Sequence, residues 1–328
     1  MSTDETILRR RAMELTLPTL VELFLATKKT EGKTDKTLGW YRQKLDKFAA
    51  FLDDGASLDD FNLNTARAFV AHLQGQETVF ADHPYRPTQN RPLSRHTIQG
   101  YARTLKSFAS FLADEDFTQD NRLTKLKIPR APEAVIEILT DEEITRLFDN
   151  PNQRCPLGNR LYTILTLLLD TGIRASELCG LRVENVHIQD NYLKVMGKGQ
   201  KERIVPFGNQ TKKDLLKWLT IWREQIANEE CPLVFVNNDG WGLTYSALQQ
   251  TIKRLGRRVK VERLRPHLFR HSFAVRYLMA GGDLMTLKLI LGHTTLAVTQ
   301  MYLHLAQSHI QVQYSKFSPV DRLRVRRR

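Results

Sequence analysis

The feature that most constrains the fold is a stretch near the middle of the chain, residues 118–139 (TQDNRLTKLKIPRAPEAVIEIL), which has no helical period. Its two prolines, Pro129 and Pro132, remove backbone donors and bias the residues before them away from helix. We therefore predict an extended linker with a boundary near Pro129 to Pro132. A chain of 328 residues is long enough to form a domain on each side of it.

Before the linker, four segments have the apolar spacing of amphipathic helices. The first segment begins near Thr16. The other three run from about Thr34 to Leu52, Asn64 to Leu73 and Ser94 to Ala113. Asn64 is the expected N-cap of the third segment. Residues 75–93, rich in Pro, Gln and Asn, are predicted to form a long surface loop. The expectation is an all-α domain over residues 16–117 after a flexible N-terminus, residues 1–15.

After the linker, residues 140–304 mix two periods. Thr140-Asp141-Glu142-Glu143 is a capping box that begins a helix, and an apolar helix from Asn159 to Leu169 ends before Gly172. Residues 182–207 contain three β-type runs, VHIQD, NYLKVMG and ERIVPF, joined by short polar turns. The predicted fold class is mainly α with a small antiparallel β-sheet: an all-α domain, then a mixed α+β domain.

The formal net charge is +13, and it is uneven along the chain. Residues 1–130 hold 20 Lys/Arg against 17 Asp/Glu, and the remainder holds 29 against 19. A basic second half indicates a polyanionic partner, of which DNA and RNA are the commonest. Charge alone leaves a membrane surface open, but no basic amphipathic helix with an aromatic face favours one.

Other functional classes find little support in the sequence. The three cysteines are scattered without a CxxC motif, and His267 and His271 lack a third ligand at zinc spacing, so we expect neither disulfides nor a metal. No apolar segment is long enough to span a bilayer, and no secretory signal stands at the N-terminus. We expect a cytoplasmic protein.

The stretch from Arg265 to His304 carries the most chemistry. His267 and Arg270 are three residues apart, so on a helix they point the same way, and a guanidinium beside an imidazole suits a phosphate. One such pair is more often a solvated helix face. His293 follows Leu291-Gly292, and Tyr302 comes nine residues later.

Two upstream positions add charges that this stretch lacks. Arg174 stands just after the turn at Gly172, where it is held rigidly; a surface charge or a salt bridge to Glu177 is the alternative. Lys198 lies between two glycines at a predicted hairpin tip. A lysine there is normally just solvated, but the flanking glycines let the backbone come close to a partner. Further basic residues, expected to contact nucleic acid or simply to aid solubility, are Arg95, Arg103, Lys106, Lys201 and Arg203.

With these residues in order, the chain resembles the tyrosine recombinases of the phage integrase and Xer class. The resemblance rests on TGIRASEL, on GKGQKER, and on PHLFRH followed by LGH and a tyrosine at the family's interval. It covers essentially the whole chain. It implies a helical core-binding (SAM-like) domain that clamps DNA, a catalytic domain, and a tail, residues 305–328, that docks on a neighbouring protomer. The alternative for the tail is a disordered basic segment.

Carried over position by position, the resemblance makes Tyr302 the nucleophile and Arg174 with Arg270 the grip on the scissile phosphate. Lys198 would protonate the leaving 5′ oxygen. His267 and His293 would assist proton transfer, and Glu177 would support the site. Neither a cofactor nor a metal is implied.

The leading hypothesis is site-specific DNA strand exchange through a 3′-phosphotyrosyl intermediate and a Holliday junction. Four protomers would act on two double-stranded recombination sites, near the nucleoid, with an accessory DNA-bending protein or a partner recombinase as a further option. A type IB topoisomerase and a non-catalytic DNA-binding regulator are the alternatives; the presence of Tyr302 and both arginines favours an enzyme. Integration or excision of a mobile element and Xer-type resolution both remain open as the biological task.

Overall fold

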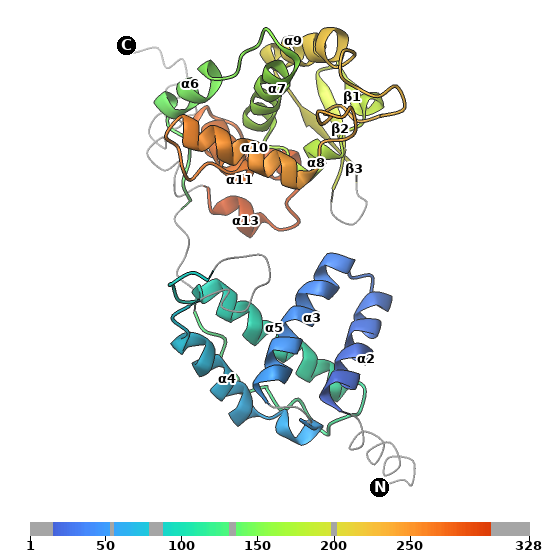
Figure 1. The fold of residues 1–328 in the computed structure, drawn as a ribbon, viewed down its shortest axis with the longest axis vertical. Helices are drawn as coiled ribbons and strands as arrows, with labels where there is room; N and C mark the ends of the chain where they lie inside the picture. The colour runs from blue at the N-terminus through green and yellow to red at the C-terminus, as the bar shows by residue number, and fades with distance from the viewer. Residues whose placement is uncertain (1–15, 53–55, 79–87, 131–135, 198–201, 303–328) are drawn as a thin grey trace, which may run out of the picture. The chain divides into compact units, whose positions relative to one another are not determined.

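A computed structural model describes residues 16–52, 56–78, 88–130, 136–197 and 202–302 (Figure 1). The chain forms two compact units, Met1–Ala134 and Val135–Arg328. Within the described ranges, no helix is long and apolar enough to cross a bilayer.

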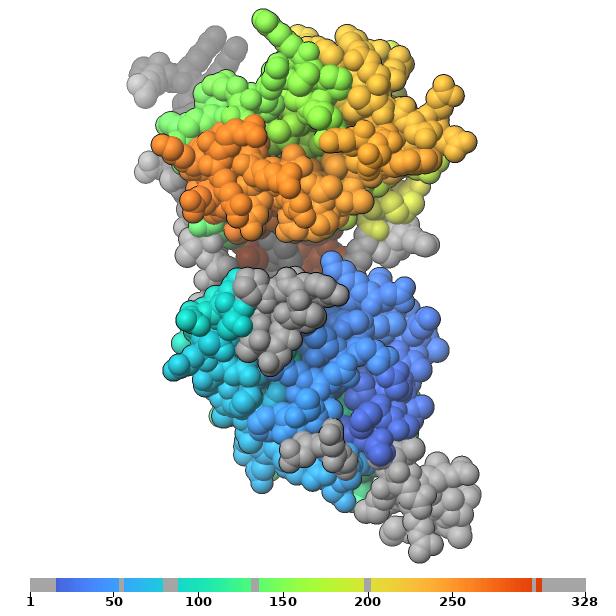
Figure 2. All heavy atoms as spheres, in the orientation of Figure 1, coloured from blue at the N-terminus to red at the C-terminus, as the bar shows by residue number. Residues whose placement is uncertain are grey.

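The first unit is built from helices around an aromatic core. Its elements are α2 (Leu17–Thr30), α3 (Asp35–Phe51), the 3-10 turn η1 (Leu58–Asp60), α4 (Leu63–Gly75) and α5 (Arg95–Asp114). Figures 1 and 2 show α2 and α3 side by side. Phe24, Phe48 and Phe108 are each at most 1% exposed and meet other rings edge to face, a favoured arrangement of aromatic pairs.

Helix starts in this unit follow local capping. The hydroxyls of Thr34 and Ser94 accept the backbone N–H groups three residues on, as expected for N-caps. The prediction for α4 was wrong: Asn62, not Asn64, is the N-cap. The Asn62 side chain accepts the N–H groups of Asn64 and Thr65, and Thr65 completes a capping box, which gives Asn62 the advantage over Asn64.

Both ends of the stretch predicted as linker pack on folded units. Leu123 and Leu126 are buried in the first unit's core, and Arg122 donates to the Leu58 carbonyl at 2.7 Å. At the other end Leu139 is fully buried in the second unit, where its N–H donates to Ser272 Oγ at 2.8 Å. These leucines are too few to show a helical period in the sequence, yet they are buried in the hydrophobic cores of the two units.

The second unit is mainly helical with one small sheet. Its helices are α6 (Asp141–Asp149), α7 (Pro156–Thr171), α8 (Ala175–Cys179), α9 (Asn209–Lys217) with the π-helical turn η3 (Trp218–Trp222), α10 (Tyr245–Arg258), α11 (Pro266–Met279), α12 (Leu284–Leu291) and α13 (Leu296–Gln300); the 3-10 turn η2 (Val183–Asn185) precedes the sheet. Helix α7 lies in the core of this unit, where its Ile164, Leu165, Leu167 and Leu168 are at most 1% exposed.

The sheet has the strand order β1 (Val186–His187), β2 (Tyr192–Met196), β3 (Glu202–Pro206), all antiparallel. Leu193 faces Val205 across β2 and β3, and both are fully buried. The predicted class, mainly α with a small antiparallel sheet, is confirmed. The first run, VHIQD, yields only a two-residue strand.

Two glycines end the helices that lead into the site. Gly172 ends α7 at a φ of 59°, and Gly292 ends α12 at 64°, conformations that a residue with Cβ seldom adopts. A Cβ on Gly172 would lie 2.4 Å from Phe273 Cδ1, so there is also no room for a side chain at this position. The chain therefore turns sharply just before Arg174 and just before His293.

Candidate active site

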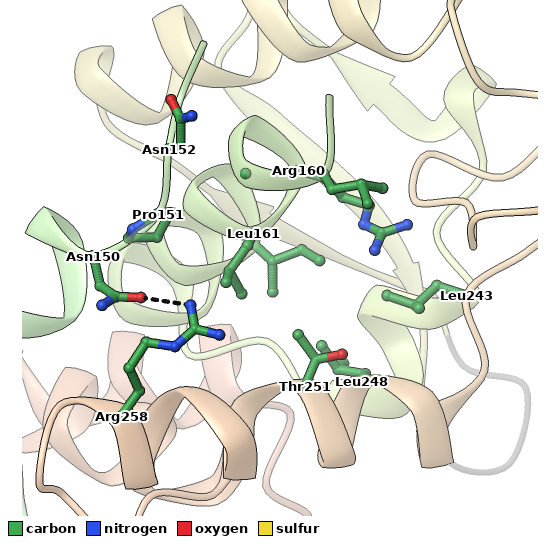
Figure 3. A pocket seen from close by; sticks show the side chains of 12 residues that line it. Asn150, Pro151, Asn152, Arg160, Leu161, Leu243, Leu248, Thr251 and Arg258 are labelled. Atoms are coloured by element: carbon green, nitrogen blue, oxygen red, sulfur yellow. Dashed lines mark hydrogen bonds between the residues drawn. The ribbon is translucent and has the colours of Figure 1, made fainter. Parts of the chain in front are cut away.

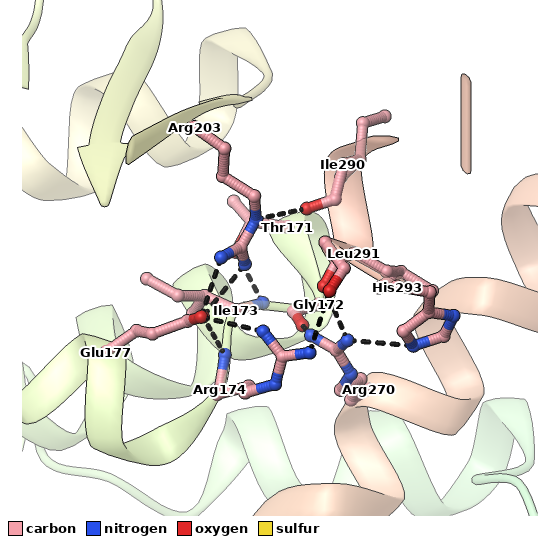
Figure 4. Close-up of polar contacts among 11 residues, drawn as sticks. Thr171, Gly172, Ile173, Arg174, Glu177, Arg203, Arg270, Ile290, Leu291 and His293 are labelled. Carbon is pink, nitrogen blue, oxygen red and sulfur yellow. Dashed lines mark hydrogen bonds and ion pairs between the residues drawn. The ribbon is translucent and has the colours of Figure 1, made fainter. Parts of the chain in front are cut away.

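The end of α12 gathers three arginines that come from three different parts of the chain (Figure 4). Arg203 on β3 donates to the Ile290 carbonyl at 2.8 Å, Arg270 on α11 to the Leu291 carbonyl at 2.6 Å, and Arg174 to the Gly292 carbonyl at 3.1 Å. The last carbonyls of a helix lack intrahelical partners and carry the negative end of its dipole, so they suit cations. The terminus of α12 is thus the frame on which the guanidiniums are set.

Glu177 on α8 joins two of these arginines. Its carboxylate accepts both terminal nitrogens of Arg203, at 2.6 and 2.8 Å, together with the side chain and the backbone N–H of Arg174, at 2.8 and 2.9 Å. The Glu177 side chain is only 4% exposed, against 12% for Arg203 and 30% for Arg174. Arg174 is therefore both in the salt bridge weighed as an alternative and partly open to solvent.

Arg270 is buried within this group. It is 5% exposed and donates to the carbonyls of Gly172 at 2.8 Å and Leu291 at 2.6 Å. Burial, followed by the charge of Arg174, lowers the pKa of Arg270 to about 10, which leaves the guanidinium protonated at neutral pH. The two glycine turns are thereby tied to one another through Arg270.

His293 is fixed in a single tautomer by its neighbours. Its Nε2 lies 2.9 Å from Arg270 Nη2, and its Nδ1 lies 2.9 Å from Thr299 Oγ1. Arginine can only donate, so Nε2 accepts and Nδ1 carries the proton. Burial and the charges of Arg270, Arg174 and Arg203 lower the pKa of His293 to about 4, so the ring is neutral at pH 7.

Tyr302 lies beside this histidine and is 3% exposed. Its ring stacks on His293 with centroids 6.4 Å apart, and its hydroxyl is 3.0 Å from Nδ1 of His271. Burial raises the pKa of Tyr302, and the charge of Arg270 offsets part of that rise. From the sequence alone His271 is only a member of an incomplete metal set, although its position four residues after His267 places it on the same helix face.

His267 begins the same face of α11. The residue is exposed, but partial desolvation of its ring and the charges of Arg270, Arg265 and Arg174 lower its pKa. Its ring centroid is 6.4 Å from that of His271. The structure thus brings together five of the residues selected from the sequence: Arg174, Glu177, Arg270, His293 and Tyr302, with His267 at the margin.

The basic residues selected as DNA contacts separate into groups. Arg203 faces inward onto Glu177 and Ile290. Lys106 is partly exposed and donates to the carbonyls of Thr124 and Leu126 at 3.1 and 3.2 Å. Arg95 and Arg103 are exposed on α5. Lys198 and Lys201 lie outside the described residues.

A separate cavity of about 340 Å³ lies between α7 and α10 (Figure 3). Leu161, Leu243 and Leu248 line it together with Arg160 and Arg258, and Arg258 donates to Asn150 Oδ1 at 3.3 Å. Arg160 donates to the carbonyl of Val236 at 2.5 Å. None of the residues selected for chemistry lines this cavity.

Comparison with known proteins decides the family. Residues 137–309, the part that holds the whole cluster, match the pattern of the phage integrase family. The chain belongs to this family. It is 31% identical to the tyrosine recombinase XerC of Oceanobacillus iheyensis, over 94% of this chain and 97% of that one, and 30% identical to the tyrosine recombinase XerD of Staphylococcus aureus, over 92% and 99%.

Solved structures agree on the fold. The Tn1549 transposon integrase in complex with transposon right end DNA superposes with a TM-score of 0.70 at 17% identity, covering 90% of this chain and 98% of that one. XerH site-specific recombinase bound to a palindromic difH substrate gives 0.68 at 20% identity, covering 93% and 85%. The family match and the XerC and XerD relatives, rather than these structures, confirm the predicted function: the chain is a site-specific tyrosine recombinase, and the topoisomerase and regulator alternatives are not favoured.

Proposed function

We propose that Tyr302 is the nucleophile of this recombinase and that Arg174 and Arg270 bind the phosphate it attacks. The observation that carries the proposal is the meeting of Tyr302, His293 and Arg270 at the end of α12. Attack by a phenolate builds negative charge on the non-bridging oxygens, and guanidiniums fixed in advance stabilise that charge. The side chain of Arg174 is partly exposed, so it is the arginine that contacts the phosphate of a DNA strand from the protein surface.

The remaining roles follow from the resemblance and the chemistry. Lys198 is the general acid that protonates the leaving 5′ oxygen. His267, at the exposed start of α11, assists proton transfer near the phosphate, and His293 orients Arg270 through its neutral ring. Glu177 positions Arg174 by accepting both its side chain and its backbone N–H.

The proposal extends to assembly and to the first unit. Residues 16–117 bind DNA as a core-binding domain, with Arg95 and Arg103 on α5 contacting phosphates. The catalytic domain spans residues 140–304. Four protomers exchange strands between two sites through a 3′-phosphotyrosyl link and a Holliday junction, and residues 305–328 dock on a neighbouring protomer. The XerC and XerD relatives favour Xer-type resolution, whereas the Tn1549 neighbour is a transposon integrase, so both tasks are to be tested.

A covalent-trapping experiment tests the central claim. Wild-type protein, Tyr302→Phe and the control Tyr192→Phe are incubated with labelled, nicked DNA fragments from the regions flanking the coding sequence and run on a denaturing gel. We expect a labelled adduct with wild type and with Tyr192→Phe, whose tyrosine stacks on His187 outside the site. Tyr302→Phe should bind the same fragment without forming an adduct.

Two outcomes would contradict the proposal. An adduct that persists in Tyr302→Phe identifies a different nucleophile. If the wild type relaxes an unrelated supercoiled plasmid without paired sites, the result favours a type IB topoisomerase instead.

A further inference from the structure

The hydroxyl of Tyr302 has a specific partner that the family resemblance did not assign. Nδ1 of His271, on α11, lies 3.0 Å from Tyr302 Oη, with ring centroids 5.7 Å apart. His271 is half-buried and Tyr302 is almost fully buried. The contact links a residue on α11 to one that follows α13, so it depends on the tertiary fold rather than on neighbouring positions.

The other bases near the hydroxyl are already engaged or face elsewhere. Nε2 of His293 accepts from Arg270, and its Nδ1–H points at Thr299, so His293 has no lone pair left for the tyrosine proton. Arg270 is a donor only. His267 stands at the exposed start of α11, one turn before His271. Among the described residues, His271 is the base with a hydrogen bond to Oη.

The surrounding charges favour a neutral His271. Burial, followed by the facing groups His267, Arg265 and Arg270, lowers its pKa, so at neutral pH Nδ1 can hold a lone pair toward the phenol. Burial raises the pKa of Tyr302 at the same time. A buried phenol that must attack at neutral pH needs a base within hydrogen-bond reach.

We propose that His271 is a catalytic residue that accepts the Tyr302 proton, an inference that rests on Tyr302 being the nucleophile. As the Oη–P bond forms, the hydroxyl proton moves to His271 Nδ1. The P–O5′ bond breaks, and the leaving oxygen takes a proton from the general acid. In rejoining, the 5′ hydroxyl gives its proton back to the deprotonated general acid as it attacks phosphorus, the Oη–P bond breaks, and His271 returns its proton to the phenolate oxygen.

The test separates holding the hydroxyl from accepting its proton. His271→Asn places an amide near the Nδ1 position, where its oxygen can accept the hydrogen bond but not the proton; His271→Ala removes both. Single-turnover cleavage of the fragment trapped by wild type should slow about 10²–10⁴-fold in both variants, and added imidazole should partly restore His271→Ala. His187→Asn is the matched control, since His187 also stacks on a tyrosine, Tyr192, and should cleave at the wild-type rate.

Two further measurements distinguish a base that accepts the Tyr302 proton from an acid that protonates the leaving oxygen. A 5′-bridging phosphorothiolate has a leaving group that needs no acid, so the defect of His271→Asn should persist on it. The wild-type rate should rise with pH through one ionisation that is absent in His271→Asn. DNA binding and the melting temperature are checked for each variant, and His271→Asn decides if His271→Ala does not fold.

The proposal is overturned if His271→Asn cleaves at the wild-type rate, if the phosphorothiolate restores its rate, or if its pH profile keeps the wild-type ionisation. These results are distinct from failure of the proposed function, in which wild type forms no adduct or Tyr302→Phe retains one.

Discussion

Replacing Glu177 with Gln removes the carboxylate that, among the residues the structure describes, pairs with Arg203. Glu177 accepts four hydrogen bonds, two from Arg203 and two from Arg174. An amide keeps one oxygen to accept, but its NH₂ group would face guanidinium donors. Arg174 is 30% exposed, so water can replace part of its loss, whereas Arg203 is 12% exposed and keeps an uncompensated buried charge.

The expected cost follows from that burial. Breaking a buried ion pair by removing one partner costs about 3–5 kcal/mol. With about 2–4 °C per kcal/mol for a domain of this size, the melting temperature should fall by roughly 6–20 °C. The matched control is Glu184→Gln, whose carboxylate pairs with Arg182 at 2.6 Å on the surface, with side chains 66% and 48% exposed; such pairs contribute about 0–1 kcal/mol.

Thermal unfolding of the full chain provides the assay. Trp218 is fully buried in the second unit, which also holds Trp222 and Trp241, so tryptophan fluorescence reports mainly on that unit. Burial alone would raise the pKa of Glu177, but hydrogen bonds from Arg203 and Arg174 outweigh it and lower the pKa. The carboxylate therefore stabilises the fold fully above the unfolded pKa of about 4.3, and this contribution is lost as the pH falls through the lower, folded pKa.

The difference in melting temperature between wild type and Glu177→Gln should accordingly be constant from about pH 6 to about pH 8 and become smaller in strong acid. A Glu177→Gln melting temperature equal to that of Glu184→Gln would refute the reasoning, because it would mean that the Arg203 charge needs no partner.

Three other expectations concern the phosphate site and its frame. Arg174→Ala should slow cleavage about 10²–10³-fold, by comparison with loss of a preorganised donor to a developing oxyanion, while melting stays close to wild type; cleavage within a few-fold of wild type would remove Arg174 from the phosphate grip. Gly172→Ala should destabilise the protein by about 1–3 kcal/mol, because its Cβ would meet Phe273 at 2.4 Å in a left-handed turn; an unchanged melting curve would show that the turn relaxes freely. Cleavage should survive EDTA while DNA binding weakens steeply with salt, measured by trapping and by titration; a strict magnesium requirement, or a flat salt response, would argue for another chemistry.

Much of the local structure follows from short-range rules. The capping box at Thr140, the glycine stop at Gly172 and the alternation of β2 and β3 are set by residues within a few positions of one another, so they can be predicted without the fold. Asn62 and Asn64 show the limit of such rules: both can cap, and the choice depends on Thr65 and on which register buries the apolar face.

Residue spacing also selected the chemistry. Arg174, Arg270, His293 and Tyr302 were recognised by order and interval alone, and the family to which the chain belongs agrees with that recognition. The roles of the individual residues stay predictions until they are tested by substitution.

What the sequence determined by itself is therefore the class of fold, the type of reaction and the residues to examine, because each depends on local propensity or on a spaced motif. What only the tertiary structure decided is which polar groups meet. Arg203 reaches Ile290 across 87 positions, and His271 reaches Tyr302 across 31. From the sequence, Arg203 is expected to contact DNA, and only the fold places it against the Ile290 carbonyl at the end of α12. His271 likewise becomes a candidate base only because the fold places the Tyr302 hydroxyl beside its ring.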